Sequence, residues 1–531
     1  MIPTQNKYGL KWTGTQKTKI NNINEIAEDI KNIKEPLFIL SENGNLFYST
    51  ENEITSDKSK GLDIIAFSMP IEMEDLGDRS FCESYGIKYP YIGGSMAKGI
   101  SSPKIVEELY KIGCLGFIGT GGYSLKQLDI DTDDLLQRNI RFGCNIINTP
   151  SNYSAEKNTV ELMLKKGINI AEASAYIELT PALIKYAVKG LKRNDSGEIV
   201  RKNKIIAKAS RIEVAKKFFS PAPENILKEL LNSREITEEE YKLALEIPIA
   251  EDITAEADSG GHTDSRPAPS LLGSFIELRD EMQKKYTQKL RIGFGGGIGS
   301  PASASMAFAS GASYIVTGTI NQACQESGTS DIVRKMLSQA SQADTAIAPS
   351  ADMFEIGAKV QVLKKGTLFP MRAQKLYNIY CAYQNIDEIP EKERKSLETT
   401  IFRDSLENIW LSTKKFFETA DPEMIKKAES SPKFKMALIF RSYLGQSAKW
   451  SIVDQEDRRI DFQIWCGPAI GTFNQWCKGS FMEDYKNRKV ADVALNILYG
   501  VAVYQRLLDF RRQGIELFSA IDLKPRQDII I

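Results

Sequence analysis

Histidine is almost absent from this chain, because His262 is the only one in 531 residues. The seven cysteines are scattered along the sequence and include no CxxC pair. Structural zinc sites are built from clustered cysteine and histidine ligands, so these two shortages argue against such a site, and we expect no metal. An odd number of unpatterned cysteines is instead typical of reduced thiols.

An excess of charge of one sign and long apolar runs are also missing. Lys plus Arg and Asp plus Glu both number 69, so no overall field attracts nucleic acid or an anionic membrane. No apolar run is long enough to cross a bilayer, and the first residues, MIPTQNKYGLKW, lack the layout of a signal peptide. We therefore expect a soluble, cytoplasmic protein that binds neither nucleic acid nor membrane, while its oligomeric state stays open.

The length and the changing composition predict more than one domain. A chain of 531 residues exceeds what a single hydrophobic core usually supports. Residues 1–75 are polar with short apolar pieces, which indicates an N-terminal extension. Residues 76–330 carry a regular rhythm of apolar runs, and beyond them long helical patterns such as ADVALNILYGVAVYQRLLDFRRQG (491–514) appear. We therefore assign residues 331–531 to a mainly helical domain that covers the substrate.

The rhythm consists of short apolar runs that end in Gly, Ser, Asn or Asp and alternate with amphipathic segments. The runs are YPYIGG (89–94), CLGFIG (114–119), IRFGCNI (140–146), INIAEAS (168–174), KIIAKAS (204–210), ITAEADS (253–259), RIGFGG (291–296) and SYIVTG (313–318). Such alternation predicts a parallel sheet covered by helices, and eight strands over this length favour an α/β fold of the (β/α)8 TIM-barrel type. A doubly wound open sheet competes with the barrel. Residues 220–246 interrupt the rhythm and predict extra helices.

The stretch RIGFGGGIGSPASASMAFASGASYIVTGT (291–319) carries the clearest chemical pattern. A predicted strand runs into Gly295, Gly296 and Gly297, and Ser300 and Pro301 then suit the start of a helix. The next strand ends at Gly318 and Thr319. Glycines let backbone N–H groups approach a phosphate closely, and the loops after strands 7 and 8 form the usual phosphate site of a barrel. We interpret them as a phosphate site; the alternative is a pair of tight turns without a ligand.

A single phosphate at a barrel rim suits FMN or a sugar phosphate, and other strand ends favour the flavin. Gly94, Met96 and Ala97 follow the first predicted strand and are small or flexible enough to let backbone lie against a flat ring. Asn145, at the third strand, suits a hydrogen bond to a flavin edge or ribityl hydroxyl. Lys208 lies within the fifth strand, where a charge is costly unless it meets an anion or a polar ring atom. Extension of its side chain to the solvent is the alternative.

At this point the sequence resembles the PfaD-type, FMN-dependent, trans-acting enoyl reductases of polyketide and polyunsaturated fatty acid synthases, relatives of nitronate monooxygenase. The resemblance covers residue 76 to the C-terminus. It rests on LGDRSF (76–81), YIGGSMAKGI (91–100), AKASR (207–211), FFSPAPE (218–224), EADSGGHTDSRP (256–267), GFGGGIGSPASASMAF (293–308), KVQVLKKGTLFPMRAQKLY (359–377) and IWCGPAIGTFNQWCKGS (464–480). One departure is Ser265, which stands where many members have Asn.

The resemblance implies a barrel that binds FMN and reduces the 2,3 double bond of an enoyl thioester on an acyl carrier protein, with NADPH as the reductant. It implies that the FMN contacts are Met96, Ala97, Asn145, Lys208, Gly295, Gly296, Gly297, Gly318 and Thr319, with Asp258, Gly260 and Gly261 beside the ring. His262 then faces the substrate. Partners are carrier domains of a polyketide or fatty acid synthase, whereas chain length and the choice between NADPH and NADH stay undetermined.

His262 follows the sixth predicted strand, at the end of a barrel where catalytic groups gather. Enoyl reduction needs a proton at Cα as well as a hydride at Cβ, and an imidazole near neutral pH suits proton donation or a contact with the thioester carbonyl. The alternative is that His262 only braces its loop. Lys208 is the second candidate for proton donor or carbonyl contact.

Two other functions stay open. The first is a nitronate monooxygenase-like flavin oxidase, against which the long helical region argues, since a small free substrate needs no such cover. The second is a non-catalytic docking subunit without cofactor, against which the intact glycine loops argue. We also consider the aromatic segment with Trp465, Phe473, Asn474 and Trp476 as a roof over an acyl channel or as ordinary core. Arg372 and Lys375 are either solvated helix charges or contacts for the carrier's phosphopantetheine.

Overall fold

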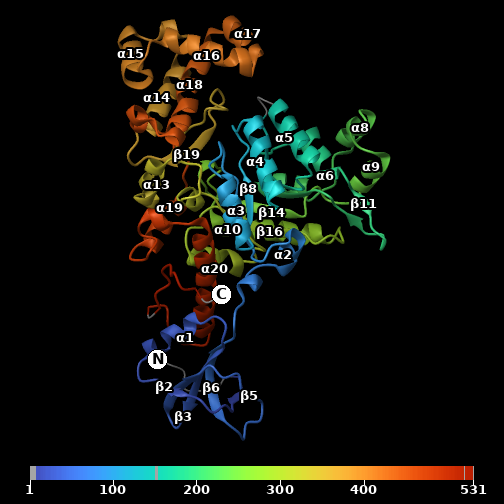
Figure 1. The fold of residues 1–531 in the computed structure, drawn as a ribbon, viewed down its shortest axis with the longest axis vertical. Helices are drawn as coiled ribbons and strands as arrows, with labels where there is room; N and C mark the ends of the chain where they lie inside the picture. The colour runs from blue at the N-terminus through green and yellow to red at the C-terminus, as the bar shows by residue number, and fades with distance from the viewer. Residues whose placement is uncertain (1–7, 150–152, 520, 530–531) are drawn as a thin grey trace.

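The computed structural model describes residues 8–149, 153–519 and 521–529. The molecule is elongated, with a small β-sheet at one end, a barrel in the middle and a helical region at the other end (Figure 1). The long helix α20 (Val490–Arg512) extends from the barrel toward the small sheet.

Eight parallel strands form a closed barrel, which confirms the predicted fold class and excludes the open sheet. In barrel order the strands are β7 (Tyr91–Gly93), β8 (Leu115–Ile118), β9 (Gly143–Ile147), β10 (Ile170–Ser174), β13 (Lys204–Ala209), β14 (Asp252–Glu256), β16 (Arg291–Gly295) and β17 (Ile315–Thr317). Closure is made by the pairing of β17 with β7, in which Ile315 lies opposite Tyr91. Each strand overlaps one of the eight predicted runs.

The amino-terminal end of the barrel is closed by a buried ion pair. Arg291 at the start of β16 donates to both carboxylate oxygens of Asp252 at the start of β14, at 2.6 and 2.9 Å. Asp252 also accepts a 2.8 Å hydrogen bond from Tyr85 of α2 (Arg79–Tyr85). All three groups are buried, whereas the carboxyl ends of the strands open into a large cavity.

Helices surround the barrel as the alternation predicts. They are α3 (Pro103–Lys111), α4 (Leu125–Gln137), α5 (Tyr153–Lys166), α6 (Pro181–Val188), α7 (Ile212–Phe218), α10 (Ala268–Gln283) and α11 (Pro301–Ala309). The segment 220–246 forms the predicted extra helices, α8 (Glu224–Asn232) and α9 (Glu238–Ala244). The start of α3 shows how local sequence sets a boundary: the Ser102 hydroxyl accepts from the Ile105 N–H, and Pro103 occupies the first turn.

The N-terminal extension is a folded sheet with its own small core. Its strands, in spatial order, are β2 (Thr18–Lys19), β4 (Asn45–Ser49), β3 (Leu37–Glu42), β6 (Leu62–Ser68), β1 (Lys11–Trp12) and β5 (Ile54–Thr55). The sheet buries Trp12, Phe38, Leu40 and Ile64. The sequence indicated an extension but not this sheet, because three of its six strands are only two residues long.

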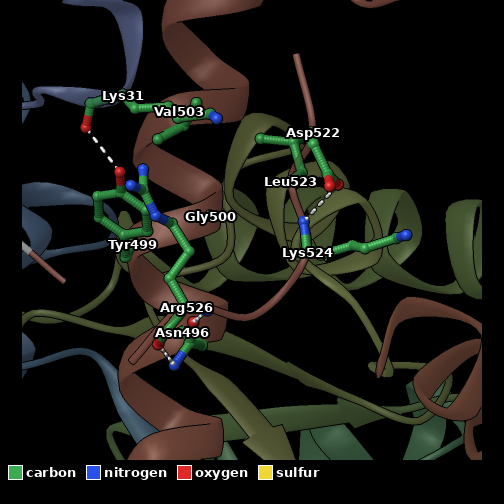
Figure 2. A pocket seen from close by; sticks show the side chains of 9 residues that line it. All are labelled: Lys31, Asn496, Tyr499, Gly500, Val503, Asp522, Leu523, Lys524 and Arg526. Carbon is green, nitrogen blue, oxygen red and sulfur yellow. Dashed lines mark hydrogen bonds between the residues drawn. The ribbon is translucent and has the colours of Figure 1, made fainter. Parts of the chain in front are cut away.

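α20 connects the N-terminal sheet, the barrel and the C-terminal segment. Tyr499 donates to the Lys31 carbonyl at 2.7 Å, and Asn496 exchanges hydrogen bonds with the backbone of Arg526 (Figure 2). The pocket between these groups measures about 10 Å³, which suits one water molecule rather than a ligand. Figure 2 therefore shows a packing contact between segments rather than a ligand site.

The C-terminal region is mainly helical but includes a small sheet that ties it to the barrel. Its helices include α13 (Asp331–Ser338), α14 (Phe369–Ala382), α15 (Glu391–Ser396), α16 (Leu406–Ala420), α17 (Pro422–Ser430), α18 (Pro432–Val453) and α19 (Ala469–Cys477). β18 (Thr345–Pro349) and β19 (Lys359–Leu363) pair with β15 (Gly261–His262), which belongs to the loop after β14. Over the described part of the chain, no helix has both the length and the apolarity to span a membrane.

Candidate functional site

One cavity of about 1230 Å³ lies at the carboxyl ends of the barrel strands, between the barrel and the helical region. Its walls contain every residue predicted to contact the flavin or to act in catalysis: Gly94, Met96, Ala97, Asn145, Lys208, Asp258, Gly260, Gly261, His262, Gly295, Gly296, Gly297, Gly318 and Thr319. These residues come from six of the eight strand ends, so only barrel closure brings them together. The cavity is large enough for a flavin nucleotide and a substrate.

Glycines form an open cradle at the ends of β16 and β17. Gly297 has φ +75°, and a methyl group at Gly297 or at Gly318 would meet nothing within 4 Å. Gly296 also has a positive φ, +89°, but a methyl group there would lie 2.7 Å from the Ala257 backbone. Gly296 therefore serves the turn itself, whereas Gly297 and Gly318 leave room for a bound group against the backbone.

The start of α11 offers fewer unpaired N–H groups to a phosphate than its sequence suggests. Ser300 and Ser303 form a reciprocal cap, and the Ser303 hydroxyl accepts from the N–H groups of Gly299 and Ser300 at 3.0 and 3.1 Å. These N–H groups are thus already paired with a side chain. The Thr319 hydroxyl likewise accepts from the Gly467 N–H at 3.2 Å, which joins the β17 loop to the C-terminal region.

A buried carboxylate that the sequence did not single out lies beside the cavity wall. Glu172 of β10 is completely buried, and its Oε2 accepts from the N–H of Ser95 at 3.0 Å and from the Ser95 hydroxyl. Its Oε1 is buried without a hydrogen-bond partner among the described residues. Asn145 lies within β9, where its amide nitrogen donates to the Glu172 carbonyl and to Ser174, so its orientation is fixed.

Lys208 is held in the barrel mouth by two carboxylates. Its Nζ lies 3.1 Å from Oε1 of Glu256 and 3.9 Å from Oε2 of Glu172. Burial disfavours the charged amine, but the charges of Glu172 and Glu256 outweigh burial and raise the pKa of Lys208. Lys208 is thus a fixed cation inside the mouth, and it does not extend to solvent.

His262 is paired with an acid from the C-terminal region. Its Nε2 lies 3.1 Å from Oδ2 of Asp352, and its own strand, β15, pairs with β19. Burial lowers the pKa of His262, but the hydrogen bond and charge of Asp352 outweigh it, so the net shift is upward. The half-exposed imidazole therefore holds its proton to higher pH than a free imidazole does.

The loop that holds His262 is tied to the C-terminal region by close backbone contacts. A methyl group at Gly260 would lie 2.9 Å from the Cys466 backbone, and Asp258 accepts from Gln361 of β19 at 3.1 Å. Gly260 is thus required by the approach of residues 466–467. Ser265 has φ +51°, in the left-handed region that Asn adopts more readily than Ser.

The far wall of the cavity comes from the helical region. Phe416, Phe417 and Met424 line it from α16 and α17, and Arg441, Leu444, Gly445 and Ala448 line it from α18. Trp465, Gly467 and Ala469 complete the wall from the segment before and at the start of α19.

The structure decides between the alternatives for the aromatic segment and corrects the expectation for Arg372. Phe473 is fully buried, Trp476 donates to the Leu523 carbonyl, and Asn474 donates to the carbonyls of Leu337 and Ala340, so of the aromatic segment only Trp465 faces the cavity. Arg372 is neither a solvated charge nor a free contact for a carrier. It pairs with the buried carboxylate of Asp461.

Glu172, Glu256 and Asp352 are the site residues that sequence reasoning missed. Glu172 and Glu256 stand in the predicted runs INIAEAS and ITAEADS, and an acid inside a buried strand was a usable signal. No local pattern connects Asp352 with His262. Among the described residues, no cluster of three or more metal-ligating side chains occurs.

Comparison with known proteins gives three findings. Residues 383–462 match the model of the inserted helical domain of [acyl-carrier-protein] S-malonyltransferase. The chain is 41% identical over 502 residues to one of the polyunsaturated fatty acid synthase subunits of Thraustochytrium sp., covering 92% of this chain and 33% of that protein. It is 45% identical over 439 residues to polyketide biosynthesis protein PksE of Bacillus subtilis, covering 82% of this chain and 57% of that protein.

A solved structure extends these similarities to the fold. The enoyl reductase domain of MlnA, from the macrolactin biosynthesis cluster of Bacillus amyloliquefaciens, superposes with a TM-score of 0.79 at 40% identity. The match covers 83% of this chain and all of that domain. The chain spans between 33% and 57% of the length of the two curated relatives named above.

Proposed function

Because the chain belongs to the PfaD-type enoyl reductase family of polyketide and polyunsaturated fatty acid synthases, we propose that it reduces enoyl thioesters on acyl carrier proteins, acting in trans with FMN and NADPH. The observation that carries the proposal is the single cavity in which the glycine cradle, Lys208 and His262 meet. The chemistry that bound FMN would supply is the transfer of a hydride from the reduced nicotinamide to Cβ of the enoyl group.

The residues of the mouth fit a flavin mononucleotide. The open space beside Gly297 and Gly318 suits a phosphate against backbone N–H groups. The orphaned Oε1 of Glu172 and the cation of Lys208 suit a polar, hydrogen-bonding ring edge nearby. Gly94, Met96 and Ala97, with no bulky polar group among them, suit the flat face of the ring, and Asn145 and Asp258 offer further polar contacts.

We assign delivery of the proton to Cα to side chains of this chain. His262, whose protonated form Asp352 stabilises, would donate a proton to Cα from Nε2 or Nδ1, and the neighbouring carboxylate would stabilise the charge before the transfer. Lys208 stays charged between Glu172 and Glu256, so it suits electrostatic stabilisation of the thioester carbonyl better than proton donation.

The test is the visible spectrum of the purified protein. We expect a yellow protein that NADPH bleaches without oxygen and that a crotonyl thioester on an acyl carrier protein restores. His262→Ala should keep the spectrum and slow the restoration by about a hundredfold, the usual loss for a general acid. A colourless protein would instead support a docking subunit, and oxidation of nitroalkanes in air without reduction of the thioester would support an oxidase.

A further inference from the structure

A lysine of the barrel that lines the cavity lies near a lysine of the helical region that is not itself part of the cavity wall. Lys98 lies in the loop after β7 and lines the cavity, and its Nζ donates to the Gly445 carbonyl of α18 at 3.2 Å. Its Nζ also lies 5.8 Å from the centre of the Trp465 ring. Lys449 follows Gly445 by one helical turn and is exposed.

The two lysines have no acidic partner. Neither forms a salt bridge within the described ranges 8–149, 153–519 and 521–529. Burial and the charge of Lys449 both lower the pKa of Lys98, and no carboxylate opposes them. Three other cations of the same cavity are compensated, Lys208 by Glu256, Arg211 by Asp264 at 2.8 Å and Arg441 by Glu355 at 2.9 Å, whereas Lys359, which also lines it, is exposed.

An uncompensated, largely desolvated cation is costly, and a bound anion removes the cost. The proposed function brings anions to this place, because a carrier-bound enoyl group arrives on a phosphopantetheine arm and the reductant is a dinucleotide. We propose that Lys98 and Lys449 form a phosphate subsite for the molecules that enter the cavity, separate from the cradle at Gly297 and Gly318. This inference rests on the proposed function for its choice of ligands.

The position of the two lysines favours an entering molecule over a resident one. Lys98 belongs to the barrel loop and Lys449 to α18, so a phosphate between them touches both parts that enclose the cavity. The Trp465 ring adds an apolar surface next to the cation. A charged end held here leaves the neutral part of the same molecule free to extend along the cavity toward Lys208 and His262.

The first experiment measures binding by calorimetry, without turnover. 4′-Phosphopantetheine is compared with pantetheine, and nicotinamide mononucleotide with nicotinamide riboside, because the members of each pair differ only in a phosphate. Lys98→Gln and Lys449→Gln remove the charge and keep a hydrogen-bonding group. For at least one phosphorylated probe we expect about tenfold weaker binding to each variant, the loss of one charge-assisted contact.

The second experiment uses steady-state kinetics with crotonyl-4′-phosphopantetheine and with crotonyl-N-acetylcysteamine, which has no phosphate. If the carrier arm is the ligand, KM rises for the first thioester only. If the dinucleotide is the ligand, KM rises for NADPH only. Lys104→Gln, at an exposed lysine of α3 outside the cavity wall, is the matched control and should change neither.

Three outcomes would contradict the proposal of a phosphate subsite. They are unchanged binding of both phosphorylated probes, equal loss for thioesters with and without phosphate, and loss of bound FMN from the variants. Lys449→Gln keeps the test decisive if Lys98→Gln misfolds, because Lys449 is exposed. A protein that binds the probes through these lysines but never reduces an enoyl thioester would refute the proposed function and leave the subsite standing.

Discussion

The imidazole Nε2 of His262 lies 3.1 Å from Oδ2 of Asp352, 90 residues further along the chain. Asp352 follows β18, and His262 belongs to β15, so the antiparallel pairing of both with β19 brings the two side chains together. Burial raises the pKa of Asp352, but His262 and Ser350 outweigh it and lower that pKa to about 2. Each group of the pair thus favours the charged form of the other.

The first prediction concerns the pH dependence of turnover. Because Asp352 raises the pKa of His262, the proton needed at Cα stays available to higher pH, and kcat/KM falls as pH rises through that pKa. Asp352→Asn removes the raising charge, so the fall should move to lower pH. Rates measured from about pH 5 to 9 test this, since an imidazole titrates in that range.

The matched control for this profile is Asp264→Asn. Asp264 lies two residues from His262 but pairs with Arg211. Its removal should leave the position of the alkaline limb unchanged. An Asp352→Asn enzyme with the wild-type limb would show that His262 does not hold the proton that limits turnover.

The second prediction concerns the buried ion cluster around Lys208. Lys208→Met leaves Glu172 and Glu256 without their cation, so the free energy of unfolding should fall by about 3 kcal/mol, the usual cost of breaking a buried pair. Adding Glu256→Gln should restore part of the loss. Urea titrations of the single and double variants measure the coupling.

A surface lysine provides the comparison for that loss. Lys216 lies on α7 and pairs with Glu281 across 3.8 Å, with both side chains more than half exposed. Lys216→Met should cost less than about 1 kcal/mol. If Lys208→Met costs no more than this, or if its effect simply adds to that of Glu256→Gln, the cluster is not coupled.

The third prediction distinguishes Gly318, which leaves room for a phosphate, from Gly296, which the turn itself requires. A methyl group at Gly318 meets nothing within 4 Å and its φ is −129°, so Gly318→Ala should fold normally and weaken FMN binding at least about tenfold by occupying the phosphate space. Gly296→Ala should instead prevent folding, because its methyl group would overlap the Ala257 backbone. FMN release followed by fluorescence distinguishes the two.

Gly273 of α10 is the control for a glycine in open space. A methyl group there also meets nothing within 4 Å, and in a helix interior Gly273→Ala should add about 0.5–1 kcal/mol of stability. It should not change FMN affinity. Unaltered FMN affinity in Gly318→Ala would exclude the β17 loop from the phosphate site.

The fourth prediction concerns the loop before α10. Ser265 adopts φ +51°, and Asn tolerates this left-handed conformation better than Ser does. Ser265→Asn should therefore raise the free energy of unfolding by about 0.5 kcal/mol. Thermal melting measures the gain, and Ser265→Val, a branched residue, should lower stability instead.

The barrel and most of the residues in its mouth follow from the sequence. Runs of small and β-branched residues that end in glycine or polar residues mark the ends of the strands. Buried parallel strands need continuous apolar residues, and the turns after them need conformational freedom. For that reason Gly297, Gly318 and Lys208 were found by position alone. The N-terminal sheet escaped notice, because three of its six strands have only two residues and leave no periodicity.

Other features depend on contacts between distant segments, and no local pattern encodes them. The acids beside Lys208 come from β10 and β14, which pair with β13 on either side in the folded sheet. Asp352 meets His262 through a sheet shared by two regions, and Lys98 meets α18 across the cavity. The sequence by itself determined which residues face the barrel mouth, since that depends on strand period and turn chemistry. The tertiary structure alone decided which charges are neutralised there and which are left for a ligand, because electrostatic interaction depends on distance in space.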